Sequence, residues 1–260
     1  MNGSTFELAL RLRAVSTLST AVGMALVIVM VGALFPAVGG SIGKLDLPEG
    51  VTDLLGGADY GTLAGWMRSE IGAVYGPLVI AGVAITAAAS LTAGEEEAGI
   101  LGLVLAHPVK RSVLVLSKGA AVAAGVLVIA LGTFIGLLVG VAIGGGGIAL
   151  ANLGALSIHL AFFGLVIGAL ALAVAAATGR KGIAVGVAAS FGLLSFLVNG
   201  FAPLVDGLEW LKYLSPFFYY EGSDPIGNGI DGGHLAVLAA ATLVLTTVAA
   251  VAVQRRDLRG

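Results

Sequence analysis

Residues 119–143 read GAAVAAGVLVIALGTFIGLLVGVAI, an uninterrupted apolar stretch without a charged side chain. A helix needs roughly 20 apolar residues to cross the hydrocarbon core of a bilayer, which is about 30 Å thick. This stretch therefore predicts a transmembrane helix. Five further stretches of the same kind lie at residues 17–37, 73–93, 153–176, 183–204 and 235–253. The sequence predicts an all-α, polytopic membrane protein with six transmembrane helices in a single domain over residues 1–260.

The composition excludes a soluble globular protein. Hydrophobic residues make up 58% of the chain and charged residues 11%, whereas soluble domains contain roughly 25% charged residues. The chain has no cysteine, which excludes disulfides, a thiolate nucleophile and a cysteine metal site.

The basic residues predict the orientation in the membrane. Loops on the cytoplasmic side of membrane proteins carry an excess of lysine and arginine. Three basic residues, Lys44, Arg68 and Lys212, fall on one side of the six predicted spans. The other ten are Arg11, Arg13, Lys110, Arg111, Lys118, Arg180, Lys181, Arg255, Arg256 and Arg259. We therefore expect both termini in the cytoplasm and the protein in the plasma membrane of a prokaryote, with its first span retained and not removed as a signal peptide.

Two segments predicted on the outer side, residues 39–72 and 205–233, are acidic and aromatic. Aromatic rings with a polar edge favour the headgroup level of a membrane. We expect both segments to lie along the outer interface, with a gate for substrate release as the alternative.

Glycines recur at four-residue spacing in the third and fourth predicted spans. Small residues at this spacing form a flat stripe that lets another helix approach closely. The stripe predicts packing within the protein, with a dimer seam as the alternative. The residues concerned are Gly132, Gly136, Gly140 and Gly144, followed by Gly164 and Gly168.

The predicted spans contain no Asp, Glu, Lys or Arg, and His159 is their only histidine. Carriers driven by an ion gradient usually place ionisable residues near the membrane midplane. Their absence favours energy supplied from outside the bilayer. His159 and Asn199 are candidate pathway residues, although either could instead only pack or bond neighbouring helices.

The loop after the second predicted span, residues 94–112, holds the densest charge cluster: GEEEAGILGLVLAHPVKR over residues 94–111. Acids at the start of a helix and cations at its end complement the helix dipole, and Pro108 cannot continue the helix. The pattern predicts one ordered helix on the membrane surface that a cytoplasmic partner contacts.

Enzyme motifs are not found. Residues 39–43, GGSIG, match the pattern around a nucleophilic serine, but they follow a membrane helix and not a strand. The glutamates at 95–97 lack the arginine of intramembrane proteases, and no phosphate-binding loop or His-Glu-x-x-His run occurs. We expect no catalytic site, no metal site, no cofactor bound by this chain and no nucleic-acid partner.

The chain between the second and third predicted spans resembles the loop between the second and third helices of ABC-2 type transporter permeases. The resemblance lies in the acidic cluster, Gly99, the residues Pro108–Arg111 and Lys118-Gly119. Weaker matches precede the second and sixth spans, and the resemblance covers essentially the whole chain. It implies a pair of permease units, each docked on an ABC-type ATP-binding subunit that uses ATP and Mg. It also implies an amphipathic connecting helix at residues 4–16. The loop would couple the two subunits through Glu95, Glu96, Glu97, Gly99, His107, Pro108, Lys110 and Arg111.

On this interpretation the chain is the membrane subunit of an ATP-driven exporter. It would move a hydrophobic or amphipathic substrate by alternating access, within membrane lipid and beside a second permease copy. A gradient-driven carrier and a membrane scaffold for a periplasmic or metal-maturation system are the alternatives, and an intramembrane enzyme is a more distant one.

Overall fold

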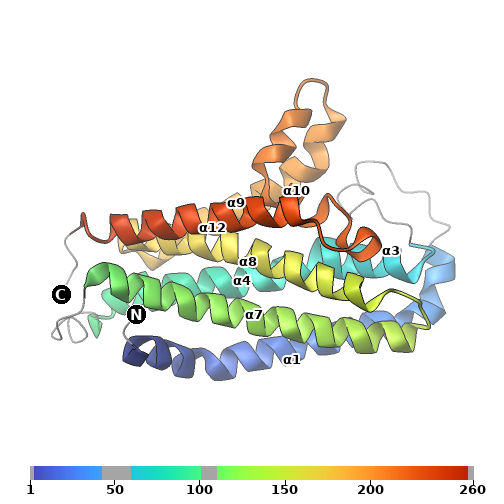
Figure 1. Ribbon diagram of the computed structural model, residues 1–260, viewed down its shortest axis with the longest axis horizontal. Coiled ribbons are helices and arrows are strands. Elements are labelled where there is room, and N and C mark those ends of the chain that lie inside the picture. Colours follow the sequence, from blue (N-terminus) through green and yellow to red (C-terminus); the bar gives the residue numbers. More distant parts are fainter. Residues whose placement is uncertain (1–2, 43–59, 101–109, 257–260) are drawn as a thin grey trace.

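A computed structural model describes residues 3–42, 60–100 and 110–256. These residues form a bundle of long helices (Figure 1), and six of the helical segments are long and apolar enough to cross a membrane, which confirms the predicted fold class. The spans are α1 (Gly3–Ile42), a composite second span (Leu63–Glu97), α7 (Arg111–Gly144), α8 (Leu150–Thr178), α9 (Lys181–Phe201) and α12 (Gly232–Ala252).

The start of α1 and the end of α12 lie at the same end of the bundle (Figure 1). We call this the basic end, because most lysines and arginines lie there, and the other the opposite end. Two turns depend on a glycine in the left-handed conformation. Gly145 (φ 75°) ends α7 at the opposite end, and Gly179 (φ 61°) ends α8 at the basic end. Side chains with a Cβ rarely adopt this conformation, so glycine allows both tight reversals.

The glycine stripe of α7 lies against α1. A Cβ at Gly132 would stand 2.7 Å from the carbonyl oxygen of Ala21, and a Cβ at Gly140 would stand 2.8 Å from that of Ile28. Gly136 and Gly144 approach α1 as closely. The two helices thus touch through their backbones, and α7 presents the stripe to α1 of the same chain.

The central helix of the bundle is α8, most of whose side chains are buried. It contacts α4, α7, α9 and α12. Gly164 faces Ile80 and Val126, and Gly168 faces Ala84 and Val122. Both glycines therefore let α8 pack closely between α4 and α7.

The second span is not one regular helix. It consists of α3 (Leu63–Met67), the π-helix η1 (Arg68–Tyr75), α4 (Gly76–Ala89), the π-helix η2 (Ser90–Gly94) and the short α5 (Glu95–Glu97). π-helical turns are rare and occur often at functional sites. Here they lie at both ends of α4.

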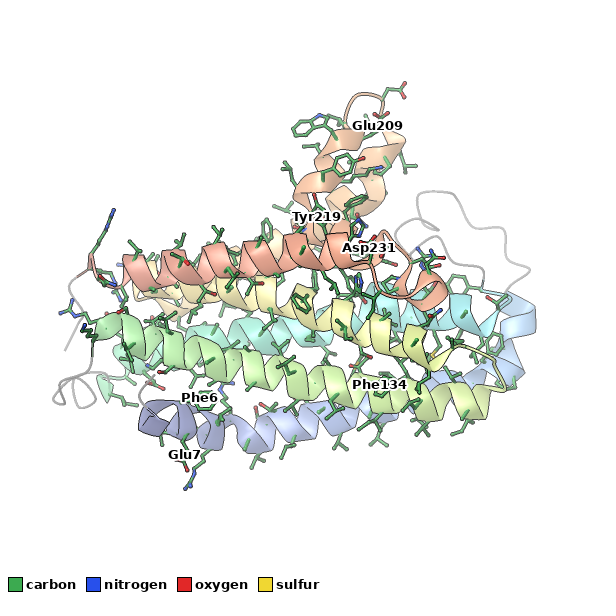
Figure 2. All side chains as sticks on the ribbon, viewed as in Figure 1. Phe6, Glu7, Phe134, Glu209, Tyr219 and Asp231 are labelled. Carbon is green, nitrogen blue, oxygen red and sulfur yellow. The ribbon has the colours of Figure 1, made fainter. Side chains whose placement is uncertain are left out.

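A helical segment between α9 and α12 projects from the side of the bundle (Figure 2), with Glu209 near its tip and Tyr219 at its base. The chain between α9 and α12 contains η3 (Ala202–Leu204), η4 (Glu209–Leu214), α10 (Pro216–Glu221) and α11 (Pro225–Asn228), and both α10 and α11 contact α8. Trp210 and Tyr213 are more than half exposed. Exposure of these rings is compatible with the predicted interfacial position.

Two aromatic residues expected at the interface are buried instead. The indole of Trp66 is inside the bundle and donates a hydrogen bond of 3.0 Å to the carbonyl of Val31. Tyr220 of the helix Pro216–Glu221 is fully buried. A buried partner for the polar edge of each ring removes the need for water. Residues 43–59 of the predicted outer segment lie outside the described residues.

The predicted connecting helix, residues 4–16, is helical but not separate, because α1 runs without interruption from Gly3 to Ile42. At about 1.5 Å per residue this helix exceeds the thickness of a bilayer core. One end of α1 must therefore extend beyond the hydrocarbon.

Candidate functional site

The three glutamates expected to start a surface helix instead end the second span. Helix α5 holds only Glu95–Glu97 and directly follows η2. Gly99 has a φ of 71°, and its N–H bonds to the carbonyl of Glu96, which ends the helix. The prediction of one helix over residues 94–112 is therefore wrong in its first part. His107 and Pro108 lie outside the described residues.

Glu95 pairs with α7. Its carboxylate accepts a hydrogen bond of 2.7 Å from the ammonium of Lys118, and the lysine side chain is almost completely buried. A buried ammonium needs a counter-charge, since desolvation without one costs several kcal/mol. Glu95 supplies it.

Glu96 pairs with the chain segment after α12. The guanidinium of Arg256 donates to both of its carboxylate oxygens, with 2.9 Å between Nη1 and Oε1. Only 4% of Glu96 is exposed. Arg256 also donates from Nε to the carbonyl of Ala176. Gly179 makes room for the guanidinium, because a Cβ there would collide with Arg256.

Glu97 is exposed and accepts a hydrogen bond of 2.9 Å from the backbone N–H of Lys181 at the start of α9. Three consecutive glutamates thus bind three different segments of the same bundle. We call this set the glutamate clamp: Glu95, Glu96 and Glu97 with Lys118, Arg256 and Lys181. Its members connect the end of the second span to α7, α9 and the chain after α12.

Electrostatics explains why the glutamate clamp pairs its carboxylates with cations. Carboxylates at the C-terminal end of a helix oppose its dipole, and cations there offset the repulsion. Lys118 and Arg256 are such cations for α5. Arg111 starts α7 and donates from Nη1 to the carbonyl of Arg256 at 2.8 Å, which adds a further connection at the same place.

These contacts change the role of the predicted coupling residues. Glu95 and Glu96 point into their own bundle, so they offer little surface to another protein. Ile100 is 46% exposed, and Lys110 is exposed at the N-cap of α7. Of the predicted coupling residues within the described chain, Glu97, Gly99 and Lys110 are exposed and therefore accessible to a partner.

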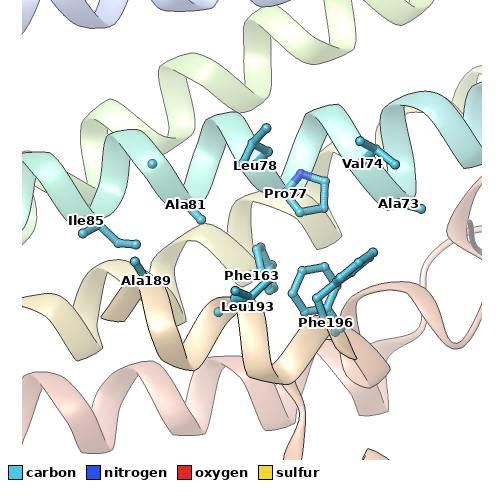
Figure 3. Close-up of a pocket in the computed structure, with 13 residues that line it drawn as sticks. Ala73, Val74, Pro77, Leu78, Ala81, Ile85, Phe163, Ala189, Leu193 and Phe196 are labelled. Atoms are coloured by element: carbon cyan, nitrogen blue, oxygen red, sulfur yellow. The ribbon is translucent and has the colours of Figure 1, made fainter. Parts of the chain in front are cut away.

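An apolar cavity of about 350 Å³ lies between the second span and α9 (Figure 3). Pro77, Leu78, Ala81 and Ile85 line it from α4. From the other side come Ala189, Gly192, Leu193 and Phe196 of α9, with Phe163 of α8 and Phe217 of α10. None of the lining residues is charged. Leu78 and Leu193 are more than 60% exposed, so the cavity opens on the flank of the bundle.

The cavity is aromatic toward the opposite end of the bundle. The ring centroids of Phe163 and Phe217 are 4.6 Å apart, and those of Phe196 and Phe217 are 5.4 Å apart. Such edge and tilted contacts favour further aromatic partners. This cavity could not be predicted from the sequence, because its residues come from four segments and carry no motif.

The predicted pathway residues do not line this cavity. His159 is fully buried in α8, and its Nε2 accepts a hydrogen bond of 3.2 Å from the backbone N–H of Asp231. The histidine therefore binds the turn before α12. Asn199 lies half-buried on α9, away from the cavity lining.

The family model described as "Multidrug efflux system permease Rv1217c, C-terminal domain" matches residues 3–254. The match covers nearly all of the chain, which therefore belongs to this family. No curated protein matches the chain. The protein is thus a permease domain of a multidrug efflux system and a multi-pass membrane protein. Membership of an efflux system implies partner subunits.

Proposed function

We propose that this efflux-permease domain exports apolar or amphipathic molecules in an ATP-driven cycle, with ATP and Mg bound by a separate ABC-type subunit. One observation carries the proposal: the second span both lines the apolar cavity and ends in the glutamate clamp. A force applied at the basic end would reach the cavity along this one span.

The π-turns supply a way for the helix to move. A π-turn inserts one extra residue into a helical turn, so that shifting the turn rotates the helix beyond it. Because η1 and η2 flank α4, α4 could rotate between them and reshape the cavity wall at Leu78 and Ile85. The clamp would transmit the same displacement to α7, α9 and the chain after α12.

The cavity suits uncharged cargo. Its volume lies in the range of pockets that hold small organic molecules, and its lining offers aromatic and aliphatic contacts without a charged group. Its opening on the flank of the bundle would admit molecules that partition into the membrane. We also propose that the transporter contains a second permease copy.

The excess of basic residues assigns the basic end to the cytoplasm, where an ATPase would be available. The partner would contact the exposed Glu97 at the end of the second span and the exposed start of α7 at Lys110. We keep the gradient-driven carrier and the scaffold as alternatives, since each gives a different result in the following experiment.

The test uses inverted membrane vesicles that contain the chain and the ATPase that copurifies with it. We expect uptake of an apolar fluorescent dye that requires ATP hydrolysis and persists when ionophores collapse ion gradients. A gradient-driven carrier would take up dye without ATP and stop with the ionophores. A scaffold would give no uptake above empty vesicles, and no copurifying ATPase would be found.

A further inference from the structure

At the opposite end of the bundle, three contacts connect α10 and α11 to η1. The hydroxyl of Tyr220 donates to the carbonyl of Gly72 at 2.7 Å. The guanidinium of Arg68 lies 3.1 Å from Asp224, between Nη1 and Oδ2, and 3.9 Å from Glu221, between Nε and Oε1. We call these contacts the latch.

The Tyr220 contact follows from the local backbone. In a π-helix the carbonyl of residue 72 would accept from the N–H of residue 77, five positions later. Residue 77 is Pro77, which has no N–H. The N–H of Gly76 bonds to Ile71. Tyr220 thus supplies the donor that Gly72 lacks, and a buried carbonyl without one would cost about 1–3 kcal/mol.

Helix α10 joins the latch to the cavity. Phe217, Tyr220 and Glu221 stand at positions i, i+3 and i+4, so they share the buried face of the helix. Phe217 lines the cavity, and the ring of Tyr220 packs 5.4 Å from that of Phe163, which also lines it. The helix that bounds the cavity toward the opposite end is therefore the helix that the latch holds.

Several buried polar atoms in and beside the latch lack a hydrogen-bond partner. Within the described part of the chain, the Nε of Arg68, Oε1 of Glu221 and Oγ of Ser223 are buried without a hydrogen-bond partner. Burying an ion pair that lacks its full set of hydrogen bonds gains little over exposing it to water. The ion pairs of the closed arrangement can thus be exposed to water at little cost, as a gate requires.

We propose that α10 is the outer gate of the cavity and that Arg68 and Tyr220 are the positioning residues that hold it shut against η1. The inference rests on the proposed function for its role in transport, since release from the cavity to the outside would require α10 to separate from η1. Its geometry is independent of which energy source drives the cycle.

The test measures access to the cavity directly and needs neither ATP nor transport. The chain has no cysteine, so Gly192→Cys supplies a single thiol inside the cavity, at a position where an added Cβ meets no atom within 4 Å. A charged, membrane-impermeant thiol reagent is added outside intact cells. We expect Tyr220→Phe to raise the labelling rate roughly fivefold, as loss of one buried hydrogen bond would. Arg68→Gln should raise it further, and Arg68→Lys should restore part of the protection.

Tyr219→Phe is the matched control, because the Tyr219 hydroxyl also donates to a carbonyl, that of Tyr213, but at an exposed position. It should leave the labelling rate unchanged. Equal labelling in Tyr220→Phe, Tyr219→Phe and the parent would overturn the gate, even if Arg68→Gln fails to fold. If Tyr220→Phe raises labelling but the protein shows no ATP-dependent export, the result would support the gate and contradict the proposed function.

Discussion

Glu96 and Arg256 stand 160 positions apart in the sequence and form a two-bond ion pair at the basic end of the bundle. The pair fixes the chain after α12 to the end of the second span. Because Glu96 is buried, its charge requires Arg256 as a counter-charge, and its carboxylate is not accessible to a partner protein.

The first prediction concerns this pair. Arg256→Met should destabilise the domain by about 3–5 kcal/mol, because it leaves a buried carboxylate without its counter-charge. The double variant Glu96→Met/Arg256→Met should recover most of the loss. Thermal unfolding in detergent measures both. A double variant as unstable as the single one would show that the charges are not the reason.

The second prediction concerns the α1–α7 contact. Gly136→Leu should prevent normal assembly, since a Cβ there would already stand 2.8 Å from the Cα of Ala25. Gly23→Leu is the matched control on α1, where no atom lies within 4 Å of an added Cβ. Size-exclusion profiles and membrane yield measure the outcome. Equal yields for the two variants would contradict the packing account.

The third prediction concerns orientation. Single cysteines at Lys110 and Arg180 should react with impermeant reagents only from the cytoplasmic side, and one at Glu209 only from outside. The three positions are exposed. Labelling of the Glu209 cysteine from inside alone would invert the topology, and the gate would then face the cytoplasm.

The fourth prediction concerns pH. Burial raises the pKa of Glu221 to about 7, although Arg68 lowers it and Asp224 adds to the rise. Tyr220 on the same helix is buried beside it, and His159 of α8 and His234 of α12 face the neighbouring Tyr219. If opening exposes Glu221, its pKa should return toward its usual value of 4.5.

The closed gate therefore binds the proton more tightly, so acid stabilises closure. This stabilisation is complete below pH 4.5 and is lost as the pH rises through about 7. Labelling of Gly192→Cys from outside, normalised to that of Glu209→Cys, should fall from pH 8 to 5.5. Glu221→Gln should remove this dependence. Faster normalised labelling in acid would contradict the account.

The spans could be predicted because length and apolarity alone determine whether a helix can cross a bilayer. The clamp could not, since Glu95 and Lys118 are 23 positions apart and no periodic pattern relates Glu96 to Arg256. Acids before a proline suggested a dipole-complementing surface helix. Tertiary pairing with cations permits the opposite arrangement, in which the acids end a helix.

The cavity and the latch could not be predicted from the sequence either. Pro77 has no N–H to offer the carbonyl of Gly72, and the donor that replaces it comes from Tyr220, 148 positions from Gly72, which no sequence pattern indicates. Likewise, Trp66 was expected at the interface because a single sequence does not show that the carbonyl of Val31 is available to it.

The most direct test of the account fills the cavity. Gly192→Phe places a ring where the glycine now leaves open space, so it should occupy the cargo site without disturbing the clamp at the basic end. In proteoliposomes with the partner ATPase, we expect ATP-dependent export of the apolar dye to fall at least tenfold, while basal ATP hydrolysis and complex formation remain. Export at the parent rate by a correctly assembled Gly192→Phe complex would contradict the assignment of this cavity as the transport site.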